Sequence, residues 1–467
     1  MLIRLFVMLS LSLWWIGAAE ATTRNAATCN TADVQTQVNA SSTGDTVVCP
    51  AGNFTWSGLT VNKAITIQGG GAATASTCPA TPGAGTTNVA LSGANTFTKS
   101  AAGIMTIRDI AFTASGGGPT DHKIMIEGSW LAARPVIFRN NSFVVNSSGL
   151  FRPGVAGGWI IANNKFWGLW DDSFLQPKNP NDTDNSWHRD STFGMRDTAS
   201  TLSGTISGTS GEINGYFETN ITCGAANQGI DMDDGSRVVV RGNTFRYGSV
   251  NSHGEDTSPN GVRHFEIYNN IFQNTSAGGW TGVSSNNDLS NTNQAIWIRG
   301  GTGVIYNNVF DDYANSVWGF GKPEARFDIR AQQDNSGTSY GTVAPPTAKY
   351  SAGKGNYPRE HQLGQSWNES LSNSVGINGG AGDYITDPIY VWGNSGAGSS
   401  GGSFLGWSNG GSWGDQTGYF NAGRDYVFGS TPKPGYTAFT YPHPVLTSGG
   451  GGGDTVPPLA PSNLRVN

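Results

Sequence analysis

The sequence predicts an all-β protein folded as a right-handed parallel β-helix, with a short helix capping its N-terminal end. Three observations support this fold class: a repeated motif, the spacing of its copies and the overall composition. In the motif, an apolar run is followed by an asparagine, one further residue and a phenylalanine. The five copies are Val136 to Phe143, Trp159 to Phe166, Val238 to Phe245, Phe265 to Phe272 and Val304 to Phe310.

The spacing of the copies is typical of a solenoid. The aligned asparagines are Asn141, Asn164, Asn243, Asn270 and Asn308. The shorter gaps match one supersecondary unit, and the longest gap could hold three. Stacked β-coils bury in one core the apolar residues that a single coil leaves exposed. Asparagine tolerates left-handed backbone at a turn, and its amide can bond the next coil. We therefore expect the asparagines in equivalent turns and the phenylalanines stacked along one axis.

The composition agrees with a coil stack and disfavours other classes. Glycine accounts for 67 of 467 residues, while charged residues are 13% and aromatic residues 11%. A disordered chain has few aromatic and many charged residues. The formal net charge of -6, with no basic cluster, disfavours a nucleic acid as partner. An acidic polysaccharide would need a local basic groove or a bound cation.

The first 21 residues have the pattern of a signal peptide. Arg4 supplies a positive charge, Leu5 to Ala18 forms an apolar core, and Ala19-Glu20-Ala21 provides the small residues of a cleavage site. We therefore expect a secreted, extracellular protein cleaved near Ala21. The apolar run is shorter than the ~20 residues of a spanning helix, and no other segment of the sequence could span a bilayer.

Export permits disulfides, and the four cysteines allow three pairings. Cys29 and Cys49 bracket the proposed cap helix, and this is the pair that we expect. Cys78 and Cys223 would lie several coils apart at ~4.8 Å per coil, which exceeds the reach of a disulfide. Unless a long loop folds back, those two are expected to be single thiols or buried apolar residues.

The remaining chain divides into four regions. Residues 22–60 are expected to form the cap, with a helix over residues 31–40 that places Val34 and Val38 on one face. Residues 61–330 form the coils. Residues 331–448 lose the repeat and are expected to be irregular loops and coils packed on the helix. Residues 449–467 are a Gly-rich linker and a tail too short to form a module.

Over roughly residues 29–445, the chain resembles the bacterial secreted parallel β-helix proteins of the pectate-lyase-like superfamily. The stretch from Cys29 to Trp56 resembles the helix and first strand that cap many such solenoids. Lys433 to Pro444 resembles a segment that often closes members of this group. The superfamily contains lyases, hydrolases, esterases and proteins without catalysis. The resemblance therefore implies the fold but no single reaction.

The segment around residues 231–266 is the richest in ionisable side chains. Coil-scale spacing would put residues distant in sequence on neighbouring levels, so they could meet in one groove. An arginine there could clamp a carboxylate with its planar fork. The candidate catalytic residues are Asp233, Asp234, His253 and Arg263, and the candidate substrate-binding residues beside them are Glu266 and Arg299.

One interpretation of this cluster is hydrolytic. Related pectin hydrolases carry an Asp-Asp pair, a His-Gly and a later arginine, and the resemblance matches these to Asp233-Asp234, His253-Gly254 and Arg299. Paired carboxylates suit glycoside hydrolysis because one protonates the leaving oxygen while the other activates water. The Asn-Thr-Asp element of those enzymes is absent, and glycine follows Arg299 where they have Ile-Lys.

The other interpretation is elimination. Pectate-lyase-like enzymes hold the uronate carboxylate with Ca²⁺ and remove the α-proton with an arginine or lysine. Ca²⁺ takes six to eight oxygen ligands, and its candidate ligands here are Asp231 and Asp233. Arg237, Arg241 or Arg263 could be the base. The Arg-x-Pro-x-x-Arg motif of those lyases is absent.

Structural interpretations compete with both. Arg237 and Arg241 could be solvent-facing strand positions, and Asp-Asp-Gly could be a simple turn. Trp167 and Trp170 lie in a tryptophan-rich stretch with acidic neighbours, and flat rings suit the apolar faces of sugars. Tryptophan in Gly-rich loops is also ordinary packing.

The sequence therefore predicts a secreted, monomeric β-helix that engages polysaccharide along a lateral groove. Two classes of function stay open. The first is a lyase or hydrolase acting on acidic polysaccharide, and the second is a non-catalytic surface or matrix protein that serves adhesion or structure. An enzyme would gather acidic and basic residues in one cleft, whereas an adhesin would show polar ladders without convergent charges.

Overall fold

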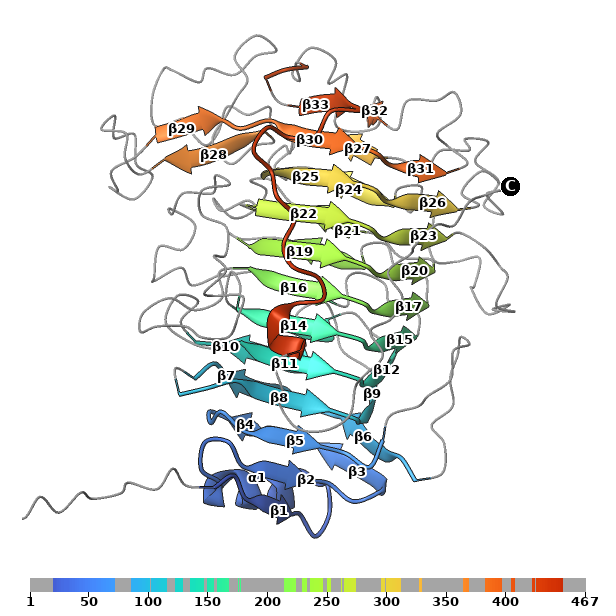
Figure 1. The fold of residues 1–467 in the computed structure, drawn as a ribbon. Helices are drawn as coiled ribbons and strands as arrows, with labels where there is room; N and C mark the ends of the chain where they lie inside the picture. Colours follow the sequence, from blue (N-terminus) through green and yellow to red (C-terminus); the bar gives the residue numbers. More distant parts are fainter. Residues whose placement is uncertain are drawn as a thin grey trace, which may run out of the picture.

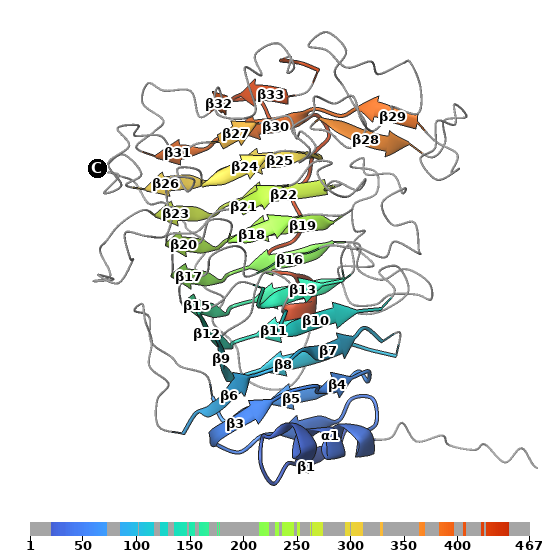
Figure 2. The same cartoon turned by 180° about the vertical axis from the view of Figure 1, so that it is seen from behind.

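The chain folds as a parallel β-helix, which confirms the predicted architecture (Figures 1 and 2). Each full coil contributes one short strand to each of three parallel sheets, here called A, B and C. The computed structural model describes residues 20–71, 85–100, 102–115, 122–128, 135–146, 149–154, 158–167, 175, 177, 214–223, 229–232, 236–246, 250–252, 262, 264–273, 295–298, 300–311, 327–329, 364–368, 383–396, 405–407, 422–424 and 426–447.

Within these residues, sheets A and B run along most of the stack. Sheet A has the order β1 (Thr23–Asn25), β2 (Thr46–Val48), β5 (Thr66–Gln68), β8 (Met105–Arg108), β11 (Val136–Arg139), β14 (Trp159–Ala162), β16 (Gly215–Glu218), β19 (Arg237–Arg241), β22 (His264–Tyr268), β25 (Thr302–Tyr306), β30 (Ile389–Trp392) and β33 (Tyr426–Gly429). Sheet B has the order β3 (Gly52–Trp56), β6 (Thr87–Leu91), β9 (Ala111–Ser115), β12 (Ser142–Asn146), β15 (Lys165–Trp167), β17 (Ile221–Cys223), β20 (Thr244–Arg246), β23 (Ile271–Gln273), β26 (Val309–Asp311) and β31 (Ser395–Gly396).

Sheet C consists of two blocks joined by single bridges of Leu175 to Phe151 and Ile230. Its strands are β4 (Thr60–Val61), β7 (Asn95–Thr98), β10 (Ile124–Glu127) and β13 (Phe151–Pro153), then β18 (Ile230–Met232), β21 (Val250–Ser252), β24 (Ile296–Ile298), β27 (Phe327–Ile329) and β32 (Leu405–Trp407). An antiparallel hairpin, β28 (Gln365–Asn368) and β29 (Asp383–Thr386), lies in the insertion before β30.

The core lies between the three sheets, because alternate strand residues point inward. In sheet A, Phe138, Ile161 and Phe217 are in register on successive strands and fully buried. Each such side chain stabilises the fold by roughly 1.5–3 kcal/mol relative to exposure. Beside the large inward ring of Trp159, the residue in register on the next coil is a glycine. Gly215 pairs with Trp159, and a Cβ at Gly215 would lie 2.1 Å from the Trp159 ring.

An asparagine ladder runs along the turn between sheets A and B, which confirms the predicted equivalence of the five asparagines. From the second member on, each ladder Oδ1 accepts both the backbone N–H, at 2.9–3.1 Å, and the Nδ2 of the asparagine one coil earlier. Each Nδ2 also donates to a strand carbonyl, as from Asn270 to Val240 at 2.9 Å. The ladder is Asn141, Asn164, Asn220, Asn243, Asn270, Asn308 and Asn394.

Two members of the ladder do not fit the sequence motif. Asn220 and Asn394 are followed, two residues later, by Thr222 and Gly396 instead of phenylalanine. The long gap after Asn164 therefore contains one further ladder position and not two. The left-handed backbone was expected at the ladder asparagine itself. It occurs instead at the residue before it, for example at Asn140 (φ 56°). The preceding residue makes the turn, and this leaves the ladder amide buried between coils.

The phenylalanines that follow the ladder stack as predicted, with one interruption. Ring centroids of Phe143 and Phe166 are 4.9 Å apart, and those of Phe245 and Phe272 are 4.8 Å apart, with nearly parallel planes. Thr222 occupies the intervening position in register. Phe217 from sheet A fills the space there, 5.7 Å from Phe166 and 6.1 Å from Phe245.

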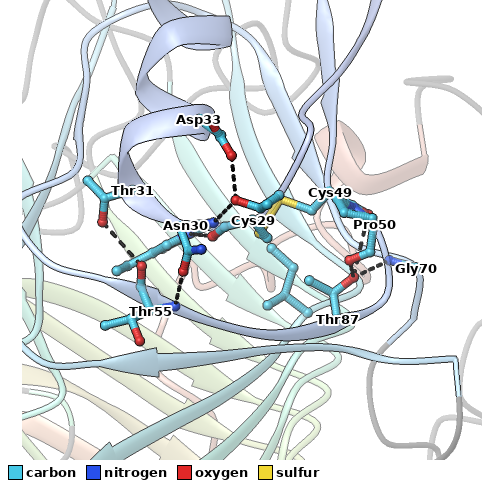
Figure 3. The surroundings of a disulfide bond; sticks show 12 residues. Cys29, Asn30, Thr31, Asp33, Cys49, Pro50, Thr55, Gly70 and Thr87 are labelled. Atoms are coloured by element: carbon cyan, nitrogen blue, oxygen red, sulfur yellow. Dashed lines mark hydrogen bonds between the residues drawn. A yellow bond between two sulfur atoms is a disulfide. The ribbon is translucent and has the colours of Figure 1, made fainter.

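The N-terminal segment contains the predicted helix and the predicted disulfide. Helix α1 (Thr31–Ala40) buries Val34 and Val38 and lies beside β1 and β2 at the N-terminal end of the stack (Figure 1). Cys29 and Cys49 are bonded across 20 residues (Figure 3). Closing a loop of that size stabilises a fold by roughly 3 kcal/mol in the chain-entropy account.

The expectation of a single thiol at Cys223 needs correction. Cys223 is disulfide-bonded and 5% exposed, so it is not a single thiol; Cys78 lies outside the described residues. Distance along the stack does not limit a disulfide to a cysteine in a long loop, because a loop can pass several coils. The coils also continue past residue 330, since β30 pairs with β25 and β33 pairs with β30 in sheet A. The sequence does not reveal this continuation, because the long segment that contains the hairpin separates β30 from its partner β25.

The ladder should carry a measurable share of the stability. Asn270→Ala leaves the Asn243 N–H and the Val240 carbonyl buried without their partner. At about 1–3 kcal/mol for each unsatisfied group, we expect a loss of about 2–6 kcal/mol in the free energy of unfolding, measured by denaturant titration. The control is Asn53→Ala, which removes an exposed amide that accepts from Asn88 and should change stability little. Equal stabilities of the two variants would contradict the role given to the ladder.

A buried aspartate gives a pH test of the N-terminal segment. The backbone N–H groups of Ser42 and Thr22, together with Arg24, bind the Asp45 carboxylate and lower its pKa to about 2. The folded pKa lies below the unfolded value, so this stabilisation is present above about pH 4 and is lost as pH falls toward 2. Asp45→Asn should therefore melt below the wild type at pH 7, and the difference should close at pH 2. A difference independent of pH would refute this assignment.

Candidate functional site

Over strands β16 to β30, the outer face of sheet A is covered by residues 433–447, here called the strap. Figure 1 shows it in red, running from the C-terminal end of the stack across β25, β22, β19 and β16 and ending in the short helix α3 (Pro444–Thr447). Phe439 and Val445 of the strap join an apolar cluster with outward residues of sheet A, such as Tyr216 and Val239. This is the segment whose sequence resembles a closing element.

A fully buried ion pair lies beneath the lower part of the strap. Arg241 Nε and Nη2 are both 2.7 Å from Glu218 Oε2, and the His443 N–H donates to Glu218 Oε1 at 2.8 Å. The rings of Tyr216 and Tyr441 each lie 5.2 Å from the guanidinium. Burial opposes the charge on Arg241, but the Glu218 carboxylate raises its pKa above the ordinary value. The strap therefore encloses this pair and supplies one of its hydrogen bonds.

A second buried carboxylate, Glu266, lies beneath the upper part of the strap. Glu266 is fully buried, accepts from Tyr436 Oη at 2.8 Å and lies 3.1 Å from His264 Nε2. Tyr436 Oη also lies 3.2 Å from Tyr306 Oη, and it accepts from the Tyr306 hydroxyl because its own proton is donated to Glu266. Burial raises the pKa of Tyr436, and the Glu266 carboxylate adds to this, so the phenol remains a donor. Glu266 thus bonds the strap and is covered, which does not agree with its expected place in a substrate groove.

Aromatic side chains complete the covered face. Tyr268, Tyr306 and Trp392 stack along the axis, with centroid distances of 4.7 and 4.5 Å. Tyr436 packs edge-on against Tyr306 and Trp392. Rings stacked on one another turn their edges, not their faces, to the outside. This column is therefore not a flat platform for a sugar, and together with the buried charges it forms an internal interface of the protein.

On sheet C, Asp231 is the described member of the predicted acidic cluster. Asp231 is 3% exposed and accepts from Asn251 Nδ2 on the next coil, so it faces outward from β18 while Ile230 and Met232 enter the core. The ends of three adjacent strands coincide here. Met232 pairs with Ser252, and Ser252 pairs with Ile298.

The described candidate residues lie on three different sheets. Trp167 is on sheet B, 2% exposed and packed with Cys223, Asp231 is on sheet C, and Glu266 is on sheet A. The structure therefore does not gather these three in one groove. The remaining candidates, Asp233, Asp234, His253, Arg263, Arg299 and Trp170, lie outside the described residues.

Two further properties concern the described residues alone. Among them, no three histidine, cysteine, aspartate or glutamate side chains come together as a metal site; the second predicted Ca²⁺ ligand, Asp233, is not among them. No helix within the described ranges has the length and apolar character needed to cross a membrane.

Comparison of the chain with protein-family models, with curated proteins and with solved structures gives no match. The residue roles above therefore rest on the geometry of this chain.

Sequence reasoning found neither of the two buried sites beneath the strap: Glu218 with Arg241 and His443, and Glu266 with Tyr436. The partners are 170–225 residues apart for the Tyr436 and His443 contacts, so no local pattern joins them. A signal was available in the closing segment, where Tyr436, Phe439 and Tyr441 recur among glycine and proline. Aromatic residues at that density in a loop indicate a segment that packs against something.

The buried pair predicts an asymmetric response to mutation. Glu218→Gln leaves the Arg241 charge buried without its partner, and we expect a loss of about 3–5 kcal/mol in unfolding free energy. The double variant Glu218→Gln, Arg241→Met removes the charge as well and should recover most of that loss. Denaturant unfolding of both variants provides the measurement. A double variant as unstable as Glu218→Gln alone would show that the unpaired charge is not the cause.

Proposed function

We propose that the protein is a secreted member of the pectate-lyase-like superfamily that engages acidic polysaccharide where β18, β21 and β24 end on sheet C. The observation that supports this proposal is the register of Met232, Ser252 and Ile298 on three consecutive coils. The residues that follow these three in the sequence are Asp233, His253 and Arg299. A carboxylate, an imidazole and a guanidinium thus follow equivalent strand ends.

Connectivity limits how far these side chains can be from one another. A residue's Cα lies about 3.8 Å from that of its predecessor, and adjacent strands are about 4.8 Å apart. On this proposal the three groups occupy successive levels of one groove, at the scale of a short stretch of sugars. Arg299 would clamp a uronate carboxylate, and Asp233 or Asp234 with His253 would transfer protons.

Hydrolysis and elimination make different demands on this groove. An inverting hydrolase needs two carboxyl groups about 6.5–9.5 Å apart, with water between them. A lyase would use Asp231 and Asp233 to hold Ca²⁺, which would bind the uronate carboxylate, and Arg263 would remove the α-proton. The Asp231 carboxylate, held by Asn251, has the chemistry that Ca²⁺ prefers in its ligands.

Secretion is part of the proposal. The Cys29–Cys49 disulfide is typical of an oxidising compartment. The Thr22 backbone nitrogen already donates to Asp45 at 2.8 Å, so an ammonium group created by cleavage after Ala21 would meet a carboxylate. We expect the exported protein to be monomeric.

The assay incubates the purified protein with acidic polysaccharides, with and without Ca²⁺. Absorbance of unsaturated products reports elimination, and new reducing ends report hydrolysis. Asp234→Ala, His253→Ala and Arg263→Ala should each lower the rate at least about 100-fold, the usual contribution of a general acid or base. The control Glu127→Ala removes an exposed carboxylate on sheet C several coils away. Activity that survives each of the three substitutions would remove these residues from the mechanism.

A non-catalytic role in adhesion or structure is the second candidate. It is favoured by the placement of Trp167, Asp231 and Glu266 on three separate sheets. It is also favoured by the asparagine ladder, whose amides hydrogen-bond within the fold. Saturable binding to a uronate polymer without any product would support this role over catalysis.

A further inference from the structure

We infer that the strap is a clamp that joins the sheet A strands β16, β19, β22, β25 and β30 into one cooperative unfolding unit. The inference concerns how the β-helix opens and does not depend on the proposed function. It rests on the order of the strap's contacts, on their chemistry and on the general behaviour of coil stacks.

The strap contacts the coils in reverse order. Lys433 Nζ lies 2.6 Å from Asp387 Oδ1, just before β30. Tyr436 contacts β25 and β22 through Tyr306 and Glu266.

Further along the strap, the contacts move to earlier coils. The Phe439 carbonyl accepts from Arg241 on β19 at 3.3 Å, and the His443 N–H donates to Glu218 on β16. One short segment therefore makes specific contacts with five adjacent strands of one sheet, and Figure 1 shows its path across them.

A stack of coils ordinarily has only nearest-neighbour coupling. Each coil contacts the coil before it and the coil after it, so a local weakness opens nearby coils and fades with distance. A segment fixed to five coils at once changes this behaviour, because no one coil can leave without losing its strap contact. The buried pair of Glu218 and Arg241 strengthens the effect, since opening at one coil would strand a charge on another.

The strap is attached by a hydrogen bond at one strand and by ring packing at another, so the two attachments can be removed separately. Tyr436 Oη holds Glu266 on β22, while Phe439 packs against Tyr216 on β16, with ring centroids 5.9 Å apart. Strands β2 and β5 lie near the N-terminal end of sheet A, several coils before β16, and serve as an internal reference.

The experiment is native-state amide hydrogen exchange on the full chain, read strand by strand. Phe439→Ala removes a ring that contacts β16. With a clamp, protection should fall by a similar factor, about 10-fold or more, in β16 and in the distant β25 and β30, because they open together. Strands β2 and β5 should keep their wild-type exchange. The matched control is Thr440→Ala, which changes the exposed neighbouring residue of the strap and should alter nothing.

Two results would overturn the clamp. A loss of protection confined to β16 and β19 would mean that the coils respond only locally. An equal loss in β2 and β5 would mean that the whole chain is one unit without help from the strap.

If Phe439→Ala fails to fold, Tyr436→Phe gives the same test from the other end. It keeps the ring contacts with Tyr306 and Trp392 and removes the hydroxyl that donates to Glu266. The clamp predicts faster exchange in β16 as well as in β22, by the same factor. Faster exchange in β22 alone would refute it.

Discussion

The hydrogen-bonded asparagine ladder is the interaction on which the rest of the structure depends. After Asn141, each ladder Oδ1 accepts hydrogen bonds from two donors of the preceding coil, and each Nδ2 donates to a strand carbonyl of an earlier coil. These bonds are buried, so a coil that slipped by one residue would leave several polar groups unsatisfied, at about 1–3 kcal/mol each. A slip would also turn every inward side chain outward. The ladder therefore fixes the register of all three sheets at one turn.

Features on the outside of the stack follow from that register. Glu218 and Arg241 face each other because β16 and β19 pair residue for residue, and Glu266 lies on the same face one coil further along. The strap can bind these residues in order because the coils present them at regular intervals. The same register aligns Met232, Ser252 and Ile298 on sheet C. A local bond at one turn thus organises charges on two other faces.

How much could be predicted from the sequence depended on the range of the interaction. The repeat predicted the parallel β-helix, because a ladder asparagine and its phenylalanine lie two residues apart. The repeat missed Asn220 and Asn394, because no phenylalanine follows them. At Thr222, the space of the missing ring is filled by Phe217 from sheet A. The role of Glu266 could not be read, because its partner Tyr436 is 170 residues away. The sequence around an acidic residue does not show whether its side chain faces an open groove or a covering segment.

The covered face constrains where function can reside. Between β16 and β30, outward residues of sheet A such as Glu218, Glu266 and Tyr306 are covered by the strap and hydrogen-bond to it. An extended substrate would have to displace the strap to reach them. On sheet B, Trp167 is covered as well. The strand ends on sheet C differ, because Asp231 and Asn251 bond each other across coils at the point where the chain continues into its most ionisable sequence. Polysaccharide chemistry, if it belongs to this chain, is best sought along that edge.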